Sequence, residues 1–428
     1  MSQGAEDHPS RLGFLDVLRG IAALLVALFH IGNAAPVGNS TFHWISHSLL
    51  NFGSFGVMLF FIVSGFIIPA SLERRGSLVE FWIGRFFRLV PLFWLLSLAV
   101  VVLWKLRLIE LPWWIFKYPL VVLFGNATLM TNFVGAPHLL GPAWTLPYEI
   151  CFYAFTSVIF VTRFRRASAG FALLLAVFAL FAADTFLVDS ALTPQAASDP
   201  HHVGNPVRVL LIAAATAAAL ALAARGRQMA LYAAGVWFVA MALFLNRSWP
   251  IHQATIFLML MFTGTVIYRM SSGQMSKRLG WVTLAIVPIA ATISFRLYFE
   301  PWGGAYGQVG GAWWTESVAA VVALLVFLGA HALRNKITWP AVLQWLGRIS
   351  YSVYLVHWVV LQAVPPMPGP AILSLIVWLG LTLGLSQLTY RFVEQPAINA
   401  GRAVALWARR KRQNPTDPDP APQESPAL

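Results

Sequence analysis

The sequence predicts an all-α protein that crosses a membrane many times, and three observations lead to this prediction. Hydrophobic residues make up 58% of the 428 residues and charged residues only 11%, whereas a soluble domain carries roughly 25% charged residues. Apolar runs near the ~20 residues that a helix needs to cross a bilayer recur along the whole chain. Basic residues stand in short clusters between these runs, which is typical of membrane-protein loops. The predicted fold is a polytopic transmembrane helix bundle of about 10–12 helices.

The apolar segments leave helix counts of ten and twelve open. Two segments that meet at residues 246–250 are also compatible with one broken helix, and residues 113–133 are compatible with an additional interfacial element. The twelve predicted segments are 14–31, 52–71, 89–109, 144–162, 170–188, 207–224, 228–245, 251–268, 280–298, 315–333, 349–364 and 371–392.

The basic residues also predict the orientation of the bundle. If the N-terminus is cytoplasmic, 22 Lys and Arg residues fall on the cytoplasmic side and 6 on the outer side, with Arg19 inside the first helix. Cytoplasmic loops of membrane proteins carry an excess of Lys and Arg. We therefore expect an even number of helices, both termini in the cytoplasm, and a location in the inner (plasma) membrane.

This assignment of segments to the membrane and its two sides divides the chain into three regions. Residues 1–13 form a cytoplasmic segment, residues 14–396 the membrane-embedded domain, and residues 397–428 a cytoplasmic tail that is basic at first and then disordered. The basic part of the tail predicts contact with anionic membrane lipids. Within the last helix, Gly380 and Gly384 form a GxxxG pattern that predicts a close helix contact.

Composition excludes some classes of function. The net charge of +13 is spread over the loops and does not form one basic domain, so we expect no nucleic-acid partner. Cys151 is the only cysteine, which excludes an intramolecular disulfide and a cysteine metal cluster. We expect no metal site, and the oligomeric state is not readable from the sequence.

Polar side chains in the first helix require a reason, because they are costly inside a membrane. Asp16 and Arg19 are three residues apart near the cytoplasmic end and can pair on one helix face. A structural ion pair explains them as well as a functional one. His30 lies about 21 Å beyond Asp16 at ~1.5 Å per residue, in the outer half of the membrane. A lone histidine at this depth in the membrane most often forms a hydrogen bond with a neighbouring helix.

Arg85 and Arg88 share one helix face at the cytoplasmic boundary of the next hydrophobic hairpin. Guanidinium groups match phosphate oxygens in geometry and charge. Lipid phosphates would satisfy both arginines, and so would an anionic donor molecule from the cytosol. The functional interpretation is a binding site for such a donor.

Glu149 begins the fourth segment at the outer side, close to the depth of His30. The helix dipole stabilises a carboxylate at this position. A carboxylate that holds an imidazole in one tautomer is also a familiar arrangement for a general base. Equal depth therefore predicts that Glu149 can orient His30.

Further polar and aromatic residues predict a cavity that takes the acceptor. Hydroxyls and an imidazole recur on the helix at 349–364, where lipid-facing residues would be apolar. The expected cavity residues are Ser64, Trp144, Tyr148, Tyr153, Tyr351, Ser352 and His357.

Taken together, these segments resemble the acyltransferase-3 family of membrane-bound acyltransferases, which modify surface polysaccharides, peptidoglycan and some antibiotics. No single motif is specific, but their joint occurrence in this order is. The matching pieces are Leu15-Asp16-Val-Leu-Arg19-Gly20 with His30, Phe61-Ile-Val-Ser64-Gly65-Phe66, Arg85-Phe-Phe-Arg88-Leu-Val-Pro91, Trp144-Thr-Leu-Pro-Tyr-Glu149 with Phe152-Tyr153, Tyr351-Ser352-Val-Tyr354-Leu355-Val-His357 and Glu394-Gln-Pro396.

The resemblance implies an enzyme that moves an acyl group, acetyl being expected, from cytosolic acyl-CoA to a hydroxyl of a saccharide or lipid-linked acceptor at the outer side. Acetyl-CoA would be a substrate, with no permanently bound cofactor. His30 would be the catalytic histidine, Arg85 and Arg88 would lie near the donor with Arg19 and Asp16, and Glu149 would lie in the active cavity.

Two questions stay open at this point. His30 is expected either to act as a base in direct transfer or to carry the acyl group transiently, with Tyr351, Ser352 or Trp144 donating to the oxyanion. A proton-coupled transporter or flippase of a lipid-linked saccharide is the alternative function, because intramembrane Asp, Glu and His residues also form proton relays.

Overall fold

The protein is a bundle of α-helices, as the sequence predicts. The computed structural model describes residues 10–34, 44–45, 50–162, 167–183, 206–224, 228–245, 250–300, 305–306, 311–368 and 370–413. The helices are α1 (Ser10–Ala34), α3 (Phe52–Arg75), α4 (Leu78–Lys105), α5 (Pro119–Thr128), α6 (Thr131–Val134), α7 (Leu146–Val161), α8 (Ser168–Ala183), α9 (Pro206–Ala224), α10 (Gln228–Phe244), α11 (Ile251–Ser271), α12 (Lys277–Phe299), α13 (Trp313–Leu333), α14 (Ala341–Arg348), α15 (Ser350–Ala363), α16 (Ala371–Thr389) and α17 (Gln395–Gln413).

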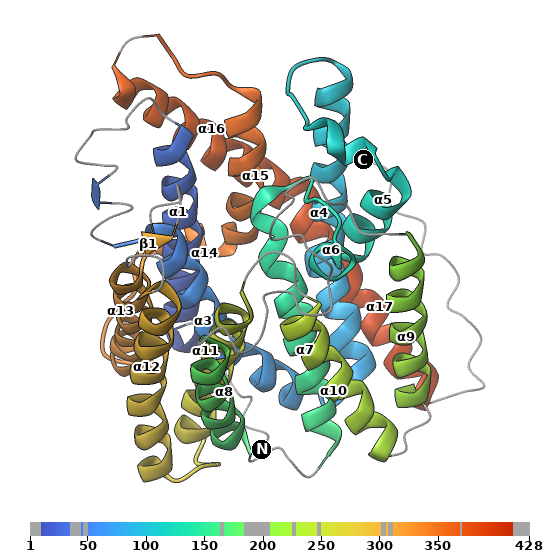
Figure 1. The fold of residues 1–428 in the computed structure, drawn as a ribbon, viewed down its shortest axis with the longest axis vertical. Helices are drawn as coiled ribbons and strands as arrows, with labels where there is room; N and C mark the ends of the chain where they lie inside the picture. The colour runs from blue at the N-terminus through green and yellow to red at the C-terminus, as the bar shows by residue number, and fades with distance from the viewer. Residues whose placement is uncertain are drawn as a thin grey trace, which may run out of the picture.

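Short elements complete the described chain. Two 3₁₀ turns cover Trp113–Phe116 and Gly141–Thr145, and a π-helical segment, Tyr390–Glu394, joins α16 to α17. Strands β1 (Ala305–Tyr306) and β2 (Gly311–Ala312) pair antiparallel before α13. Figure 1 shows the helices side by side, with α9 at one edge and α12 and α13 at the opposite edge.

Each of the twelve predicted segments overlaps a helix, and residues 184–188 of the segment 170–188 lie outside the described residues. Among the described residues, eight helical stretches are long and apolar enough to cross a membrane: Gly13–Gly32, Phe52–Arg75, Leu78–Lys105, Gly141–Val161, Ile251–Ser271, Lys277–Phe299, Trp313–Leu333 and Ala371–Lys411. The other predicted segments correspond to the shorter helices α8, α9, α10 and α15. The expected interfacial element at 113–133 is a 3₁₀ turn followed by α5 and α6.

Helix α11 lies at the centre of the bundle and packs closely on α3. A helix that is apolar on every side is expected to be buried. In agreement with this, nearly every residue of α11 is buried. The backbones of the two helices touch at two glycines. A Cβ added to Gly65 would collide with the carbonyl oxygen of Met261, and one added to Gly264 with that of Ile62. Thr265 Oγ1 also donates a hydrogen bond to the Gly65 carbonyl at 2.9 Å.

We expect Gly65→Ala to destabilise the protein by at least about 3 kcal/mol, because the backbone contact between α3 and α11 leaves no room for a methyl group. The measurement is the melting temperature of the detergent-purified protein. Gly380→Ala is the matched control, since a Cβ there meets no described atom within 4 Å. Equal melting temperatures for the two variants would contradict the packing.

Three segments differ from the sequence-based expectation. Helix α4 begins at Leu78 and not at 89, because Ser77 accepts a hydrogen bond from the amide of Glu80 and caps it. Residues 395–413, most of which were assigned to the tail, form α17, which lies against α4 (Figure 1). The GxxxG pair in α16 makes no close contact within the described chain. The predicted disordered tail at 414–428 lies outside the described residues.

Candidate active site

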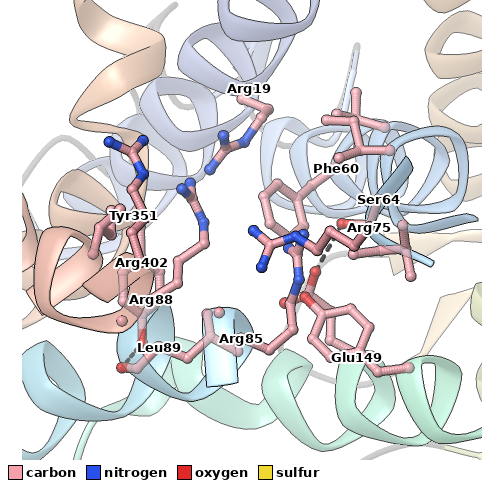
Figure 2. A pocket seen from close by; sticks show the side chains of 17 residues that line it. Arg19, Phe60, Ser64, Arg75, Arg85, Arg88, Leu89, Glu149, Tyr351 and Arg402 are labelled. Carbon is pink, nitrogen blue, oxygen red and sulfur yellow. Dashed lines mark hydrogen bonds between the residues drawn. The ribbon is translucent and has the colours of Figure 1, made fainter. Parts of the chain in front are cut away.

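A strongly basic pocket opens where α1, α3, α4, α7, α15 and α17 meet. Its volume is about 200 Å³. Figure 2 shows arginine side chains from several helices directed into it. The lining residues are Arg19, Phe60, Val63, Ser64, Ile67, Ile68, Arg75, Gly84, Arg85, Arg88, Leu89, Glu149, Tyr153, Tyr351, Ile398, Gly401 and Arg402.

The charge of the lining is unbalanced. It contains five arginines and one carboxylate, that of Glu149. Like charges that share a partly buried site repel each other, and burial removes the water that would stabilise them. An anion with several negative charges would offset this cost. The lining therefore matches a polyanion in charge.

Aromatic rings and hydroxyls hold the innermost groups in place. Arg85 donates from Nη2 to Ser71 Oγ at 3.2 Å. Its guanidinium lies 5.3 Å from the ring centre of Phe81 and 5.5 Å from that of Tyr153, within cation–π range. Glu149 is 3% exposed and accepts a hydrogen bond from Ser64 Oγ at 2.7 Å. These contacts leave the guanidinium of Arg85 fixed beside the carboxylate.

Glu394, which the sequence analysis quoted only within the family-like motif Glu394-Gln-Pro396, lies near this site without lining it. It lies in the π-helical segment, is 1% exposed, and accepts a hydrogen bond from Ser352 Oγ at 2.8 Å. The charges of Arg88 and Arg19 act on it. π-Helical turns occur frequently at functional sites. A carboxylate inside an apolar segment was the sequence signal for such a role.

His30 and His357 form a stacked pair at the far end of α1. His30 Nδ1 lies 3.1 Å from His357 Nε2, and the ring centres are 5.2 Å apart. His357 is fully buried, with its Nδ1 2.9 Å from the carbonyl oxygen of Val353. A carbonyl only accepts, so His357 Nδ1 carries the proton. In a neutral His357, Nε2 then accepts from His30 Nδ1–H, which places the lone pair of His30 on Nε2.

This pairing corrects the expected contact between Glu149 and His30. Glu149 lies in the first turn of α7 and faces the arginine pocket, with Ser64 as its partner. Helix α1 packs mainly on α3, α14 and α15, whereas α7 packs mainly on α10 and α3. The structure places His357, and not Glu149, at hydrogen-bond distance from His30.

A small cavity lies between the arginine pocket and the histidine pair. Its volume is about 30 Å³, and it shares Phe60, Glu149 and Tyr351 with the pocket. At its other end lies Tyr354, whose ring centre is 6.3 Å from that of His357. The further lining residues are Ala22, Ala23, Val26, Gly56, Val57, Thr145, Leu146 and Ser350. The cavity is mostly apolar and adjoins the arginine pocket, and neither His30 nor His357 lines it.

Two of the expected oxyanion donors have other acceptors. The Tyr351 hydroxyl donates to the carbonyl of Leu89 at 2.7 Å, and that of Ser352 donates to Glu394. Trp144 and Tyr148 pack in an aromatic cluster with Phe257, with edge-on and tilted rings, and do not line the arginine pocket.

Asp16 also lies outside the pocket lining. Within the described part of the chain, the one ion pair at contact distance joins Arg269 and Glu73, so the expected Asp16–Arg19 pair does not form. The backbone of α1 at Asp16 packs directly on Gly347 of α14, where a Cβ would collide with the Asp16 carbonyl. The charge of Arg19 acts on Asp16 at longer range.

Two known proteins are similar to most of this chain, and a third is similar to part of it. YrhL of Bacillus subtilis is 23% identical over 426 residues, which cover 92% of this chain and 56% of that protein. The peptidoglycan O-acetyltransferase OatA of Listeria monocytogenes is 23% identical over 407 residues, 89% of this chain and 55% of that protein. Nodulation protein 10 of Rhizobium leguminosarum is 30% identical over 182 residues, 39% of this chain and 48% of that protein.

The chain thus spans about half the length of the relatives it matches. No solved structure matches it. The family described as an acyltransferase domain, of the acyltransferase-3 type, matches residues 12–197 and 207–391. This match covers nearly all of the helical bundle, and the chain belongs to the acyltransferase-3 family.

Proposed function

We propose that this protein is a membrane O-acyltransferase that moves an acyl group, acetyl being expected, from cytosolic acyl-CoA to a hydroxyl of a saccharide or similar acceptor at the outer side of the inner membrane. Family membership supports acyl transfer over the transporter alternative. The observation that carries the choice of donor is the pocket with five arginines and one carboxylate.

Charge favours coenzyme A over smaller donors. Its 3′-phosphate monoester carries about −1.5 to −2 charge at pH 7, and each phosphorus of its diphosphate adds roughly one more. The total approaches the excess of four positive charges in the lining. Acetyl phosphate and a phospholipid carry less charge. Arginine is also the side chain best suited to grip phosphate oxygens in pairs.

The pantetheine arm is long and thin, and the small cavity offers it a path. With the phosphates among the arginines, the arm would pass Phe60 and Tyr354 and present the thioester to the histidine pair. Phe60 and Tyr354 lie parallel, with ring centres 6.5 Å apart. The hydroxyl of the acceptor would approach His30 from the end of the bundle that is predicted to face outward.

The tautomer of His30 supports direct transfer. Its Nε2 lone pair takes the proton of the acceptor hydroxyl as the oxygen attacks the thioester carbon. The new C–O bond forms, the C–S bond breaks, and the proton passes to the departing thiolate of coenzyme A. His357 stabilises the imidazolium by accepting from His30 Nδ1–H, much as a carboxylate does in other acyl-transfer sites.

The test is transfer of label from labelled acetyl-CoA to membrane extract by the purified protein. We expect labelled product from the wild type. Arg85→Ala is expected to raise the KM for acetyl-CoA about 10- to 100-fold, since charge-assisted hydrogen bonds to the phosphates are lost.

Arg278→Ala is the matched control, because Arg278 is exposed and lies outside the pocket. Its KM should equal that of the wild type. Folded protein that releases no coenzyme A from any acyl-CoA would overturn the proposal, and transport of a lipid-linked saccharide into liposomes without an acyl donor would replace it.

A further inference from the structure

The five pocket arginines fall into two groups by exposure. Arg19, Arg85 and Arg88 are half-buried, whereas Arg75 and Arg402 are exposed. Glu149 and Tyr351 line both the pocket and the small cavity. The half-buried arginines lie within electrostatic reach of them, since the charge of Glu149 acts on Arg19 and Arg85 and that of Arg88 acts on Tyr351. Arg75 and Arg402 therefore lie at the mouth of the pocket, and Figure 2 shows that they enter from different sides.

Arg75 is held at the mouth by the backbone of α4. It ends α3 and donates from Nη1 to the carbonyl of Glu80 at 2.7 Å. Its guanidinium lies across Gly84, where an added Cβ would be 2.6 Å from Nη1. The missing side chain at Gly84 leaves the space that this guanidinium occupies. The position of Arg75 is thus built into the hairpin between α3 and α4.

Arg402 reaches the same opening from α17. The neighbouring Gly401 lets α17 approach α4 closely, since a Cβ there would lie 2.7 Å from Phe87. Arg402 donates from Nη1 to Asn399 Oδ1 at 3.3 Å. The positive charge of Arg402 also acts on Arg75. Two cations thus lie within electrostatic reach of each other across the mouth, and the Glu149 carboxylate lies in the deeper part of the lining.

The proposed donor has two phosphate groupings that match the two arginine groups. The thioester enters first, so the diphosphate next to the pantetheine follows it inward, and the adenosine with its 3′-phosphate stays nearest the cytosol. We infer that Arg75 and Arg402 form the subsite for the 3′-phosphate of coenzyme A, while Arg19, Arg85 and Arg88 hold the diphosphate. This inference rests on the proposed function and assigns α17 a direct part in choosing the donor.

The test compares binding of coenzyme A and 3′-dephospho-coenzyme A to the purified full-length protein by calorimetry. Removing the 3′-phosphate is expected to weaken binding to the wild type about 10- to 100-fold. Arg402→Gln and Arg75→Gln should each weaken binding of coenzyme A about 10-fold and leave binding of the dephospho form unchanged. Comparing both ligands with the wild type and each variant isolates the contact between the arginine side chain and the 3′-phosphate, as a double-mutant cycle does.

Arg409→Gln is the control, because Arg409 is exposed on the same helix and outside the pocket. Arg402→Lys should retain part of the preference for the 3′-phosphate, and melting temperatures identify any variant that misfolds. Equal binding of the two ligands by the wild type would overturn the subsite, as would equal loss for both ligands in Arg402→Gln and Arg75→Gln. Absence of binding to both ligands, together with absence of acyl transfer, would instead overturn the proposed donor.

Discussion

Replacing His30 by alanine is expected to lower kcat for acyl transfer by about 10²- to 10⁴-fold, which is the contribution of a well-placed general base. The KM for acetyl-CoA should stay within about twofold of the wild-type value, since His30 does not line the arginine pocket. The contacts that bind the donor equally well before and during the reaction are therefore unchanged. Steady-state transfer of label from acetyl-CoA measures both constants.

A buried histidine outside the site, His252, provides the control for this variant. His252 is 1% exposed and stacks on Tyr298, with ring centres 3.9 Å apart, and it lines neither the pocket nor the small cavity. His252→Leu should retain most of the activity of the wild type. Full turnover by His30→Ala would exclude both direct transfer through this imidazole and an acyl-histidine intermediate.

The second large effect is expected at His357. In His357→Leu, His30 Nδ1–H loses its acceptor, and the imidazole is free to move its proton to Nε2, where the base is needed. We expect kcat to fall on the order of 10²-fold, as in other sites where the partner that fixes a catalytic histidine is removed. The KM for acetyl-CoA should be unchanged.

A conservative variant separates positioning from packing. Glutamine offers an oxygen acceptor, so His357→Gln should recover part of the kcat that His357→Leu loses, at a similar melting temperature. A merely structural role would give losses that follow the melting temperature alone. If leucine and glutamine at 357 give the same kcat, His357 does not set the tautomer of His30.

Much of the bundle was predictable because the bilayer imposes strong rules on sequence. Each of the twelve apolar segments became a helix, since backbone groups in a hydrocarbon environment must be hydrogen-bonded within the segment. Polar residues in those segments marked the chemistry. Arg19, Arg85, Arg88, Ser64, Glu149, Tyr153 and Tyr351 were singled out from the sequence and meet in one pocket.

Other parts of the site depend on which helices are neighbours. His30 and His357 are 327 residues apart in sequence, and depth along a helix axis could not distinguish His357 from Glu149 as the partner of His30. Lipid chains and apolar side chains are similar surroundings for a helix. Hydrophobicity therefore predicts that a helix spans the membrane but not which face packs on which partner.

The sequence by itself determined the class of fold, the helical segments and the residues that resemble an acyltransferase. Only the tertiary structure decided that His357 lies at hydrogen-bond distance from His30, that the π-helical segment brings Glu394 within range of Arg19 and Arg88, and that α17 supplies Arg402. The physical reason is that composition and periodicity act along one segment. Ligand sites in helical bundles are made by side chains from several segments, and their meeting is decided by packing.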